Sequence, residues 1–324
     1  MRVLVTGGAG FIGSNLVGNL LADQHIERVR VLDNLATGSN DNVEEFNTSS
    51  KFEFIQADIR DYSACINACD GIDILSHQAA LGSVPRSIND PITTNEVNIT
   101  GTLNVFTAAK EKKIKRVVYA ASSSTYGDHT ALPKVEDRIG KPLSPYAITK
   151  YVNELYADVF ARLYEIEFIG LRYFNVFGPK QSPNGPYAAV IPLFMESALT
   201  GKSPIINGDG ETSRDFTFVA NVVQANLLSL FTTDKRAINQ VYNIGLGEQT
   251  SLAQLIDYLK EISSSEIEPI HVAERPGDVK HSLADISKAK LLLGYNPKVS
   301  VKEGLRETYE WYSQNRKSHL KSLV

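Results

Sequence analysis

The sequence TGGAGFIG occupies residues 6–13 and decides the fold. A short apolar run precedes it, and a helical pattern follows at once. Gly7, Gly10 and Gly13 have G-x-x-G-x-x-G spacing. Gly7 permits a tight turn, Gly10 allows the backbone to approach a pyrophosphate, and Gly13 allows the helix to pack close to the strand. The sequence therefore predicts a strand, a glycine loop and a helix whose N-terminus can bind phosphate.

Strand-like runs and helical patterns alternate outward from this loop. The runs are almost continuously apolar, as expected of parallel strands covered on both faces. The expected strands are Val3–Thr6, Val29–Asp33, Phe52–Gln56, Ile72–His77, Val117–Ala121 and Phe168–Leu171, and the expected helices are Ile12–Ala22, Tyr62–Ala68, Asn95–Glu111 and Pro145–Leu163. The predicted fold class is α/β, with a Rossmann-type doubly wound parallel sheet.

The composition of the chain changes near residue 174. Pro and Gly become frequent there, and the predicted helices become shorter. Two of these helices are expected at Asn221–Phe231 and Leu252–Glu261. We therefore expect a dinucleotide-binding domain over residues 1–173 and a smaller α/β substrate lobe over 174–324. A segment near 215–245 is expected to return to the first domain.

Composition excludes several classes of protein. The 324 residues carry a formal net charge of −4, so no basic field for nucleic acid is evident. No signal peptide is expected, and no apolar run approaches the about 18 residues that a membrane helix needs. Cys65 and Cys69 are four residues apart without a further ligand, so buried thiols are expected rather than a metal site. The expected location is the cytoplasm.

Acidic and small residues follow the next strands. Asp33 ends the run RVRVLD, 20 residues beyond Gly13, where a carboxylate can accept hydrogen bonds from an adenosine ribose. Such a carboxylate would repel a 2′-phosphate, which favours NAD over NADP. Asp58 is a candidate for the adenine edge or, equally, a loop or capping residue. Ala79 and Ala80 are small enough for a cofactor to lie against the backbone.

The candidate chemistry lies in the run SPYAITKY. Tyr146 and Lys150 are four residues apart and share one face of a predicted helix. A nearby ammonium favours a phenolate, so the pair can form a general base near neutral pH. Ser122 follows the run VVYAA, where its hydroxyl could bond the reacting oxygen and share a proton with Tyr146. Each motif alone is weak; their combination in this order is specific.

The chain resembles the extended short-chain dehydrogenases/reductases over essentially its whole length. More narrowly it resembles the bacterial UDP-N-acetylglucosamine 4-epimerases, in the UDP-galactose 4-epimerase family. The runs that carry this resemblance are TGGAGFIGSN, LGSVPRSINDP, YAASSSTYGDH, LPKVED, GKPLSPYAITKYVNELYADVF, LRYFNVFGP, YAAVIP, INGDGETSRDF and RPGDVKHSLADISKA.

The resemblance implies an NAD-dependent epimerase acting on a UDP-sugar. Hydride would leave carbon 4 of the sugar for NAD while Tyr146 takes the 4-hydroxyl proton, and a 4-keto sugar would turn over before hydride returns. Relatives pair through four helices, which would here be those around Asn95–Glu111 and Tyr146–Leu163 in a homodimer.

The resemblance also implies residue roles. Residues expected at the cofactor are Gly7, Gly10, Phe11, Ile12, Gly13, Asp33, Asn34, Gly38, Asp58, Ile59, Ala79, Ala80, Asn98, Tyr146, Lys150 and Phe174. Residues expected at the UDP-sugar are Ser83, Ser123, Ser124, Asn175, Ala189, Val190, Asn207, Arg214, Arg275, Asp278 and Ser282. Ser282 falls where members restricted to UDP-glucose and UDP-galactose carry tyrosine, so a 2-acetamido group would have room.

Rival functions remain open on the same fold. A 4,6-dehydratase would need an acid and a base after the strand-end hydroxyl, where this chain has Ser123 and Ser124. In nucleotide-sugar decarboxylases, the helix that carries the Tyr/Lys pair has a sequence that differs from SPYAITKYVNE. A UDP-glucuronate 4-epimerase is closer, and a redox-sensing binding module is the non-enzymatic alternative. The intact Ser122, Tyr146 and Lys150 favour an enzyme.

Overall fold

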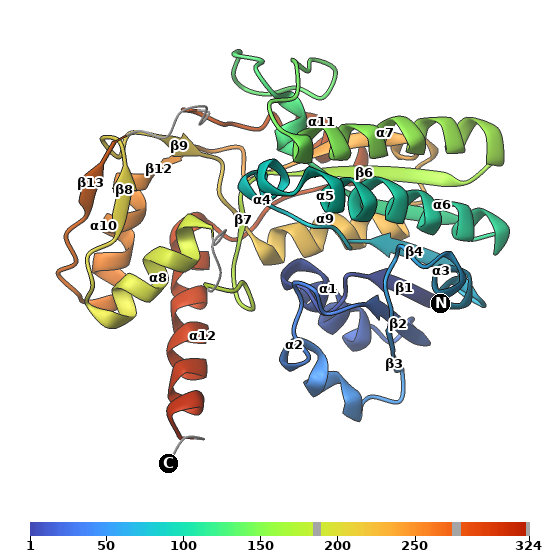
Figure 1. The fold of residues 1–324 in the computed structure, drawn as a ribbon, viewed down its shortest axis with the longest axis horizontal. Helices are drawn as coiled ribbons and strands as arrows, with labels where there is room; N and C mark the ends of the chain where they lie inside the picture. Colours follow the sequence, from blue (N-terminus) through green and yellow to red (C-terminus); the bar gives the residue numbers. More distant parts are fainter. Residues whose placement is uncertain (184–188, 274–279, 322–324) are drawn as a thin grey trace.

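A seven-stranded parallel sheet forms the centre of the computed structural model, which describes residues 1–183, 189–273 and 280–321 (Figure 1). The strand order is β11-β6-β5-β4-β1-β2-β3, and all neighbouring pairs run parallel. The strands are β1 (Arg2–Thr6), β2 (Arg28–Asp33), β3 (Phe52–Gln56), β4 (Ile74–His77), β5 (Arg116–Ser122), β6 (Glu167–Tyr173) and β11 (Gln240–Ile244). The predicted fold class is confirmed.

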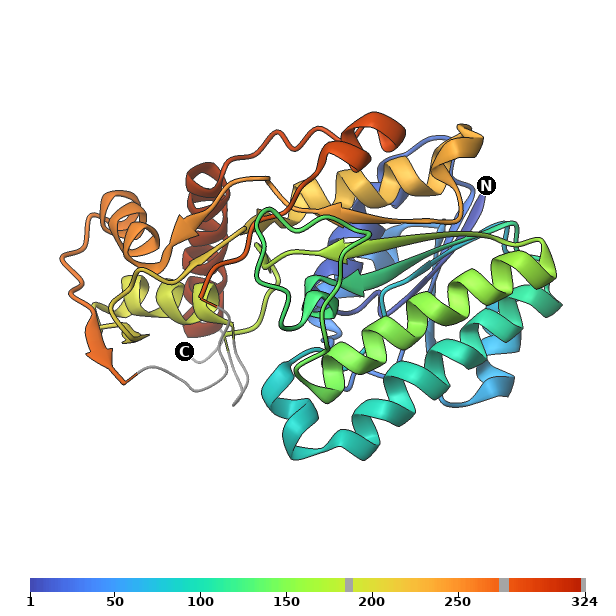
Figure 2. The ribbon, with the colours of Figure 1, turned by 90° about the horizontal axis from the view of Figure 1, so that it is seen from above.

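Helices cover both faces of this sheet (Figure 2). One face carries α3 (Tyr62–Cys69), α6 (Thr102–Glu111) and α7 (Pro145–Tyr164), and the other carries α1 (Phe11–Ala22), α9 (Val219–Phe231) and α11 (Ser287–Leu293). The central strands β1 and β4 are buried almost throughout, which explains their unbroken apolar sequence. Shorter elements between them are α2 (Asp41–Glu44), η1 (Glu45–Thr48), α4 (Val84–Asn89), α5 (Pro91–Asn95), η2 (Glu96–Gly101), η3 (Ser123–Tyr126) and η4 (Lys235–Ala237).

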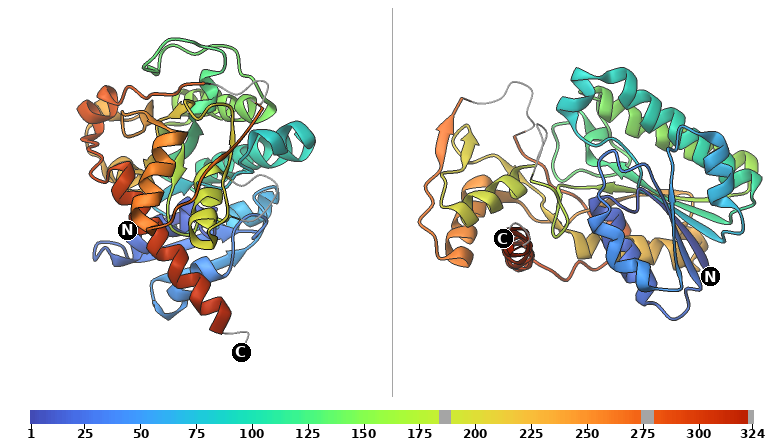
Figure 3. Two further views of the ribbon diagram at one scale, coloured as in Figure 1. Left: turned by 90° about the vertical axis from the view of Figure 1, so that its left-hand side faces the viewer. Right: turned by 60° about the horizontal axis from the view of Figure 1, so that its bottom comes forward.

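The second lobe consists of three packed helices and short strand pairs, to one side of the main sheet (Figure 3). The helices are α8 (Val190–Thr200), α10 (Leu252–Ser263) and α12 (Val301–Lys321). The strand pairs are β7 (Val176–Phe177) with β10 (Thr217–Phe218), β9 (Ser213–Arg214) with β12 (Thr250–Ser251), and β8 (Ile205–Asn207) with β13 (Ile270–Val272). One apolar core cluster is continuous from the main sheet into this lobe.

The chain crosses between the two lobes more than once. After β6 it enters the second lobe, and it then returns through α9 and β11. Strand β11 pairs with β6 from Gln240↔Ile169 to Ile244↔Tyr173, and so completes the edge of the main sheet. Residues 219–244 therefore rejoin the main sheet, and the first 173 residues supply six of its seven strands.

The expected elements of the first half occur within about two residues of their predicted bounds, with one correction. The continuous helix expected at Asn95–Glu111 begins with a π-helical stretch, η2, before α6. Such stretches occur mostly as single turns inserted within α-helices. No prediction was made for the helices α2, α4, α5, α8, α11 and α12. None of the described helices is long and apolar enough to cross a membrane.

Candidate active site

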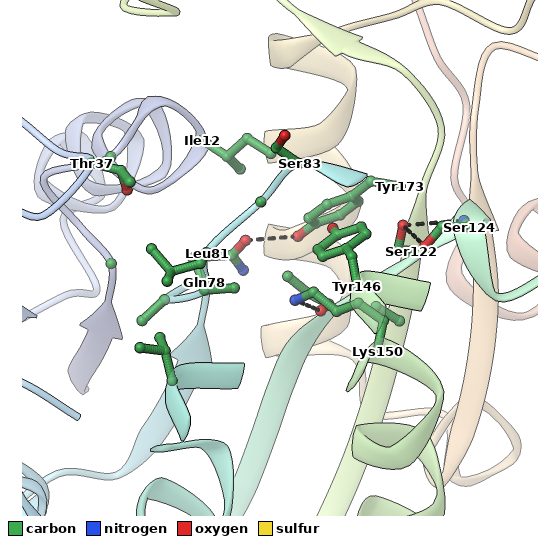
Figure 4. A pocket seen from close by; sticks show the side chains of 18 of the residues that line it. Ile12, Thr37, Gln78, Leu81, Ser83, Ser122, Ser124, Tyr146, Lys150 and Tyr173 are labelled. Carbon is green, nitrogen blue, oxygen red and sulfur yellow. Dashed lines mark hydrogen bonds between the residues drawn. The ribbon is translucent and has the colours of Figure 1, made fainter. Parts of the chain in front are cut away.

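A cavity of about 1020 Å³ opens at the carboxyl ends of the parallel strands (Figure 4). Six strands deliver residues to it from their ends or from the loops that follow. The second lobe closes it with Asn175, Val176, Arg214 and Ser282. Ligands of open α/β sheets bind in this crevice, so position alone marks the cavity as the candidate site.

The glycine loop forms one wall of the cavity in a backbone conformation that requires glycine. Gly7 has φ of +71°, and a Cβ there would lie 2.6 Å from the main-chain nitrogen of Ala79. A Cβ at Gly13 would lie 2.1 Å from the Gly7 carbonyl oxygen, whereas at Gly10 the nearest atom would be 3.2 Å away. Gly10 caps α1 without a side-chain hydrogen bond, so the amides of the first turn remain available to an anion.

Asp33 is buried at the end of β2 and holds the glycine loop in place. Its carboxylate accepts hydrogen bonds from the main-chain N–H groups of Ala9, at 3.0 Å, and Leu35, at 2.8 Å. Burial raises the pKa of this carboxyl group, and the two amides lower it. Each oxygen keeps a lone pair for a ribose hydroxyl. The loop, the helix terminus and this carboxylate together fit an adenine dinucleotide.

Asp58 lines the same end of the cavity and also organises its own loop. It accepts hydrogen bonds from Asn34 at 2.8 Å and from the guanidinium of Arg60 at 2.8 Å. The hydrogen bonds from Arg60 are the largest cause of its lowered pKa. Asp58 therefore has the loop role, and its place on the cavity wall keeps the adenine-edge role as a prediction.

Tyr146, Lys150 and Ser122 converge on the cavity from α7 and β5 (Figure 4). Ser144 caps α7 by accepting a hydrogen bond from the Ala147 N–H at 3.1 Å, and Pro145 occupies the first turn. The Ser122 hydroxyl accepts a 2.9 Å hydrogen bond from Ser124. Its own proton therefore remains free for Tyr146 or for a ligand oxygen.

In this structure the ammonium group of Lys150 binds the main chain rather than the Tyr146 hydroxyl. Burial raises the pKa of Tyr146, while a hydrogen bond with Ser122 lowers it less. The ammonium of Lys150 instead donates to the carbonyl oxygen of Ala120 at 2.8 Å, and burial lowers its pKa to about 8. The sequence spacing places both groups in one site, but it does not determine the direction of the lysine side chain.

A polar network that the sequence did not indicate lies beside Ser122, Tyr146 and Lys150. The hydroxyl of Tyr173 donates to Gln78 at 3.0 Å (Figure 4). The Asn226 amide donates to Tyr173 at 2.8 Å. The Gln78 amide also donates to Asn226 at 3.0 Å. The network joins the ends of β4 and β6 to α9, which no local motif could have indicated. Tyr173 and Gln78 both line the cavity.

A buried carboxylate, Asp215, organises the wall contributed by the second lobe. It is 0% exposed and accepts hydrogen bonds from the N–H groups of Leu246, Gly247 and Ala284 at 2.7, 3.0 and 3.2 Å. Burial raises its pKa to about 6. The carboxylate thus ties together three segments, including those that carry Arg214 and Ser282.

The structure brings most of the predicted site residues onto the cavity wall. Those that line it are Gly7, Gly10, Phe11, Ile12, Gly13, Asp33, Asn34, Asp58, Ile59, Ala79, Ala80, Ser83, Ser122, Ser123, Ser124, Tyr146, Lys150, Asn175, Arg214 and Ser282. Ser83 has φ of +106°, a strained conformation for a residue other than glycine.

Six predicted residues lie away from the cavity wall, and two fall outside the described residues. Gly38 packs against Ala9, Asn98 binds the main chain of Leu81, and Phe174 lies in the core. Asn98 can therefore act on the site only through the loop that it holds. Ala189, Val190 and Asn207 belong to α8 and β8, and Arg275 and Asp278 lie outside the described residues.

The two cysteines lie away from this chemistry. Cys65 and Cys69 are buried in α3, and burial raises the pKa of each thiol to about 12. Neither thiol therefore provides a thiolate near neutral pH, in agreement with their interpretation as small apolar side chains.

His77 is expected to make the stability of the fold depend on pH. It is buried between Thr6 and Thr102, whose hydroxyls lie 2.7 and 2.9 Å from its two ring nitrogens. Burial, followed by the charge of Lys150, lowers its pKa to about 3. The unfolded chain therefore binds the additional proton between about pH 6.5 and pH 3, and stability is lost as the pH falls through this range.

We expect the protonation of His77 in the unfolded chain to lower the free energy of unfolding by about 2 kcal/mol when the pH falls from 7 to 5. Urea unfolding at both pH values would measure the loss, and His77→Gln should remove that part of it. His25→Gln, at an exposed side chain, is the control and should keep the wild-type dependence. An equal loss in wild type and His77→Gln would contradict the assignment.

The parallel sheet, the glycine loop and the Ser122, Tyr146 and Lys150 site define a short-chain dehydrogenase/reductase. Residues 3–245 match the model of the NAD dependent epimerase/dehydratase family, and the chain belongs to that family. NAD is the cofactor that this site takes, in agreement with the fit of the glycine loop and Asp33.

Known relatives resemble the chain over nearly its full length. It is 37% identical to a UDP-glucose 4-epimerase of Mycolicibacterium smegmatis, covering 96% of this chain and 98% of the relative. A UDP-N-acetylglucosamine 4-epimerase from Methanobrevibacter ruminantium, in complex with UDP-N-acetylmuramic acid, is 39% identical with a TM-score of 0.91, covering 97% and 98%. The Thermus thermophilus UDP-glucose 4-epimerase complex with NAD is 35% identical with a TM-score of 0.86, covering 97% and 99%.

Proposed function

We propose that this protein is an NAD-dependent 4-epimerase that interconverts UDP-N-acetylglucosamine and UDP-N-acetylgalactosamine. The convergence of Ser122, Tyr146 and Lys150 beside the glycine loop carries the proposal, because it puts a proton acceptor next to the cofactor site. The relatives named as UDP-sugar 4-epimerases support the reaction class.

In the proposed mechanism, the chain's own residues move one proton out and back. Tyr146 takes the proton of the sugar 4-hydroxyl, and Ser122 bonds the same oxygen while Ser124 fixes the Ser122 hydroxyl. Lys150 supplies the positive charge that favours the phenolate once its ammonium turns from Ala120. The glycine loop and Asp33 would hold NAD, which would supply a hydride acceptor and donor for carbon 4 of the sugar. No net redox change results.

The second lobe provides the proposed UDP-sugar site. Arg214 would bind the diphosphate, and Asn175 the phosphates or the ribose. Ser83, Ser123 and Ser124 would face the hexose. By resemblance alone, Arg275 remains a proposed diphosphate ligand. The proposed uridine-side residues, again by resemblance alone, are Asp278, Asn207, Ala189 and Val190.

A coupled assay without added nicotinamide tests the proposed function. Purified protein should convert UDP-N-acetylglucosamine to its 4-epimer, because recycled NAD need not be supplied in stoichiometric amounts. UDP-glucose and UDP-glucuronate are the comparison substrates. Absence of epimerisation with all three, in protein shown to contain NAD, would refute the proposal.

Ser282 supports the N-acetylated sugars as substrates, because a small side chain stands at the cavity wall there. We expect Ser282→Tyr to lower kcat/KM for UDP-N-acetylglucosamine about 10-fold or more relative to UDP-glucose, since an overpacked site costs about 1–3 kcal/mol. Steady-state kinetics on both sugars measure the ratio. Ser282→Ala keeps the space and should preserve the ratio; equal losses in Ser282→Tyr would contradict this specificity.

UDP-glucuronate 4-epimerase is the second candidate function. A Bacillus cereus enzyme of that name, in complex with UDP-glucuronic acid and NAD, is 33% identical with a TM-score of 0.89. A dehydratase is less well supported, because Ser123 and Ser124 offer hydroxyls and no carboxyl group. Faster turnover of UDP-glucuronate than of UDP-N-acetylglucosamine would favour the second candidate.

We also propose that the enzyme is a cytoplasmic homodimer. The outer face of α7 exposes Ile148, Leu155 and Leu163, and Ile92 of α5 is exposed beside it. Apolar side chains gathered on neighbouring helices are typical of a protein interface. Light scattering at micromolar concentration would give the molar mass of two chains.

A further inference from the structure

Lys134 places a buried ammonium group on the wall of the cavity. The residue is 4% exposed and lines the cavity, and its Nζ donates a hydrogen bond to the carbonyl oxygen of His129. Three hydrogen bonds fix the main chain of Lys134. Its N–H donates to the carbonyl oxygen of Leu283 at 2.8 Å. Its carbonyl oxygen accepts from the N–H of Asp285 at 2.9 Å and from the side-chain amide of Asn243 at 2.8 Å.

The pairing of Lys134 with the segment around Ala284 places Lys134 on the same face as Ser282. Lys134 forms a parallel bridge with Ala284, so the side chains of these two residues lie on one face. Ser282 is two residues before Ala284 in the extended segment, and residues two apart in an extended chain share a face. Both Lys134 and Ser282 line the cavity. Lys134 and Ser282 therefore lie on one face of the two paired segments, at the wall of the same cavity.

The charge of Lys134 lacks compensation within the described parts of the chain. No carboxylate of those parts forms an ion pair with it, and burial alone lowers its pKa. An ammonium has three donors, of which the His129 carbonyl uses one. A buried cation with unused donors is costly unless an acceptor reaches it. The cavity is the direction from which a ligand acceptor can come.

We propose that Lys134 determines substrate specificity by donating a hydrogen bond to the acyl oxygen of a 2-acylamino group on the hexose. The proposal rests on the proposed UDP-sugar epimerase function and assigns a partner to the group for which Ser282 leaves room. A carbonyl oxygen is a good acceptor for an ammonium donor, whereas a free 2-ammonium group would be repelled. Lys134 would thus select acylated amino sugars over unacylated ones.

The test compares three substrates that differ at carbon 2: UDP-N-acetylglucosamine, UDP-glucose and UDP-glucosamine. Lys134→Met removes the donor and the charge with a similar unbranched side chain. We expect kcat/KM for UDP-N-acetylglucosamine to fall about 10- to 100-fold relative to UDP-glucose, the range for a hydrogen bond to a charged group. Turnover of UDP-glucosamine should rise, because the ammonium that repels its 2-ammonium group is absent. This assay is run at about pH 6, where the sugar amine carries its proton.

Lys134→Gln keeps a donor without the charge, and it also serves if Lys134→Met fails to fold. It should retain more activity on the acetylated sugar than Lys134→Met, yet still accept UDP-glucosamine better than the wild type does. Equal losses on all three substrates would overturn the proposal and leave Lys134 a structural role. A selective loss on UDP-glucose would also overturn it. Wild-type inactivity on all the UDP-sugars would instead refute the proposed function.

Discussion

Replacing Tyr146 by phenylalanine is expected to lower kcat by about 10²- to 10⁴-fold, the range that a positioned acid or base contributes. The substitution removes one oxygen from a side chain that faces Ser122 and the cavity, and it leaves the ring and α7 in place. Ser122 cannot replace it as a base, since its hydroxyl has no carboxylate or imidazole beside it among the contacts that the structure gives. Single-turnover and steady-state epimerisation both measure the loss.

A matched control for this variant lies on the same helix. Tyr164 is at the exposed end of α7, remote from the cavity, and Tyr164→Phe keeps the ring beneath the Lys110 ammonium. Its kcat should equal that of the wild type. The NAD content of Tyr146→Phe should also be unchanged if the hydroxyl acts on the proton. Near-wild-type kcat in Tyr146→Phe would remove the residue from the mechanism.

Replacing Arg172 by methionine is expected to destabilise the protein by about 3–5 kcal/mol, because it leaves a buried carboxylate without its partner. Arg172 of β6 binds Glu154 of α7 through two hydrogen bonds of 2.9 and 2.7 Å, and both side chains are almost fully buried. The guanidinium also lies 4.9 Å from the centre of the Tyr126 ring and donates to the Glu136 carbonyl at 2.9 Å. Equilibrium urea unfolding measures the loss.

Two further variants separate the buried charge from other effects of this substitution. Arg172→Met combined with Glu154→Met should recover most of the stability, because the unpaired charge is then absent. Arg162→Met breaks an exposed ion pair with Asp158 on the same helix and should cost less than about 1 kcal/mol. A double variant that is less stable than Arg172→Met alone would show that packing, rather than charge, dominates.

The sequence predicts the main sheet well because its signals are local. Each strand is an apolar run that ends in a residue of distinct chemistry, such as Asp33 or Ser122, and the strand ends meet at one edge. The second lobe is less predictable, because four of its described strands contain only two residues and depend on partners far along the chain. Strand β9, for example, exists through its pairing with Thr250 and Ser251.

The candidate site also has features that local sequence predicts and features that depend on distant contacts. Tyr146 and Lys150 are predictable from helical spacing, but the bond from Lys150 to Ala120 is not. Lys134 and Asp215 gave no sequence signal, since a lone lysine or aspartate is usually exposed. Asp215 accepts a hydrogen bond from Ala284, 69 residues further along the chain, and the main chain of Lys134 bonds to Leu283 and Asp285. A local sequence pattern does not show contacts at such separations.

The position of β11 has a consequence for the order in which the molecule can form. Strand β6 remains an open edge until residues 240–244 are available, and unpaired edges promote association between chains. Pairing of β6 with β11 joins residues 71 apart, such as Ile169 and Gln240, so loop closure slows it. During synthesis, the cofactor-binding sheet therefore stays incomplete until much of the second lobe has emerged. A fragment that ends near residue 173 would be a poor stand-alone module for binding NAD.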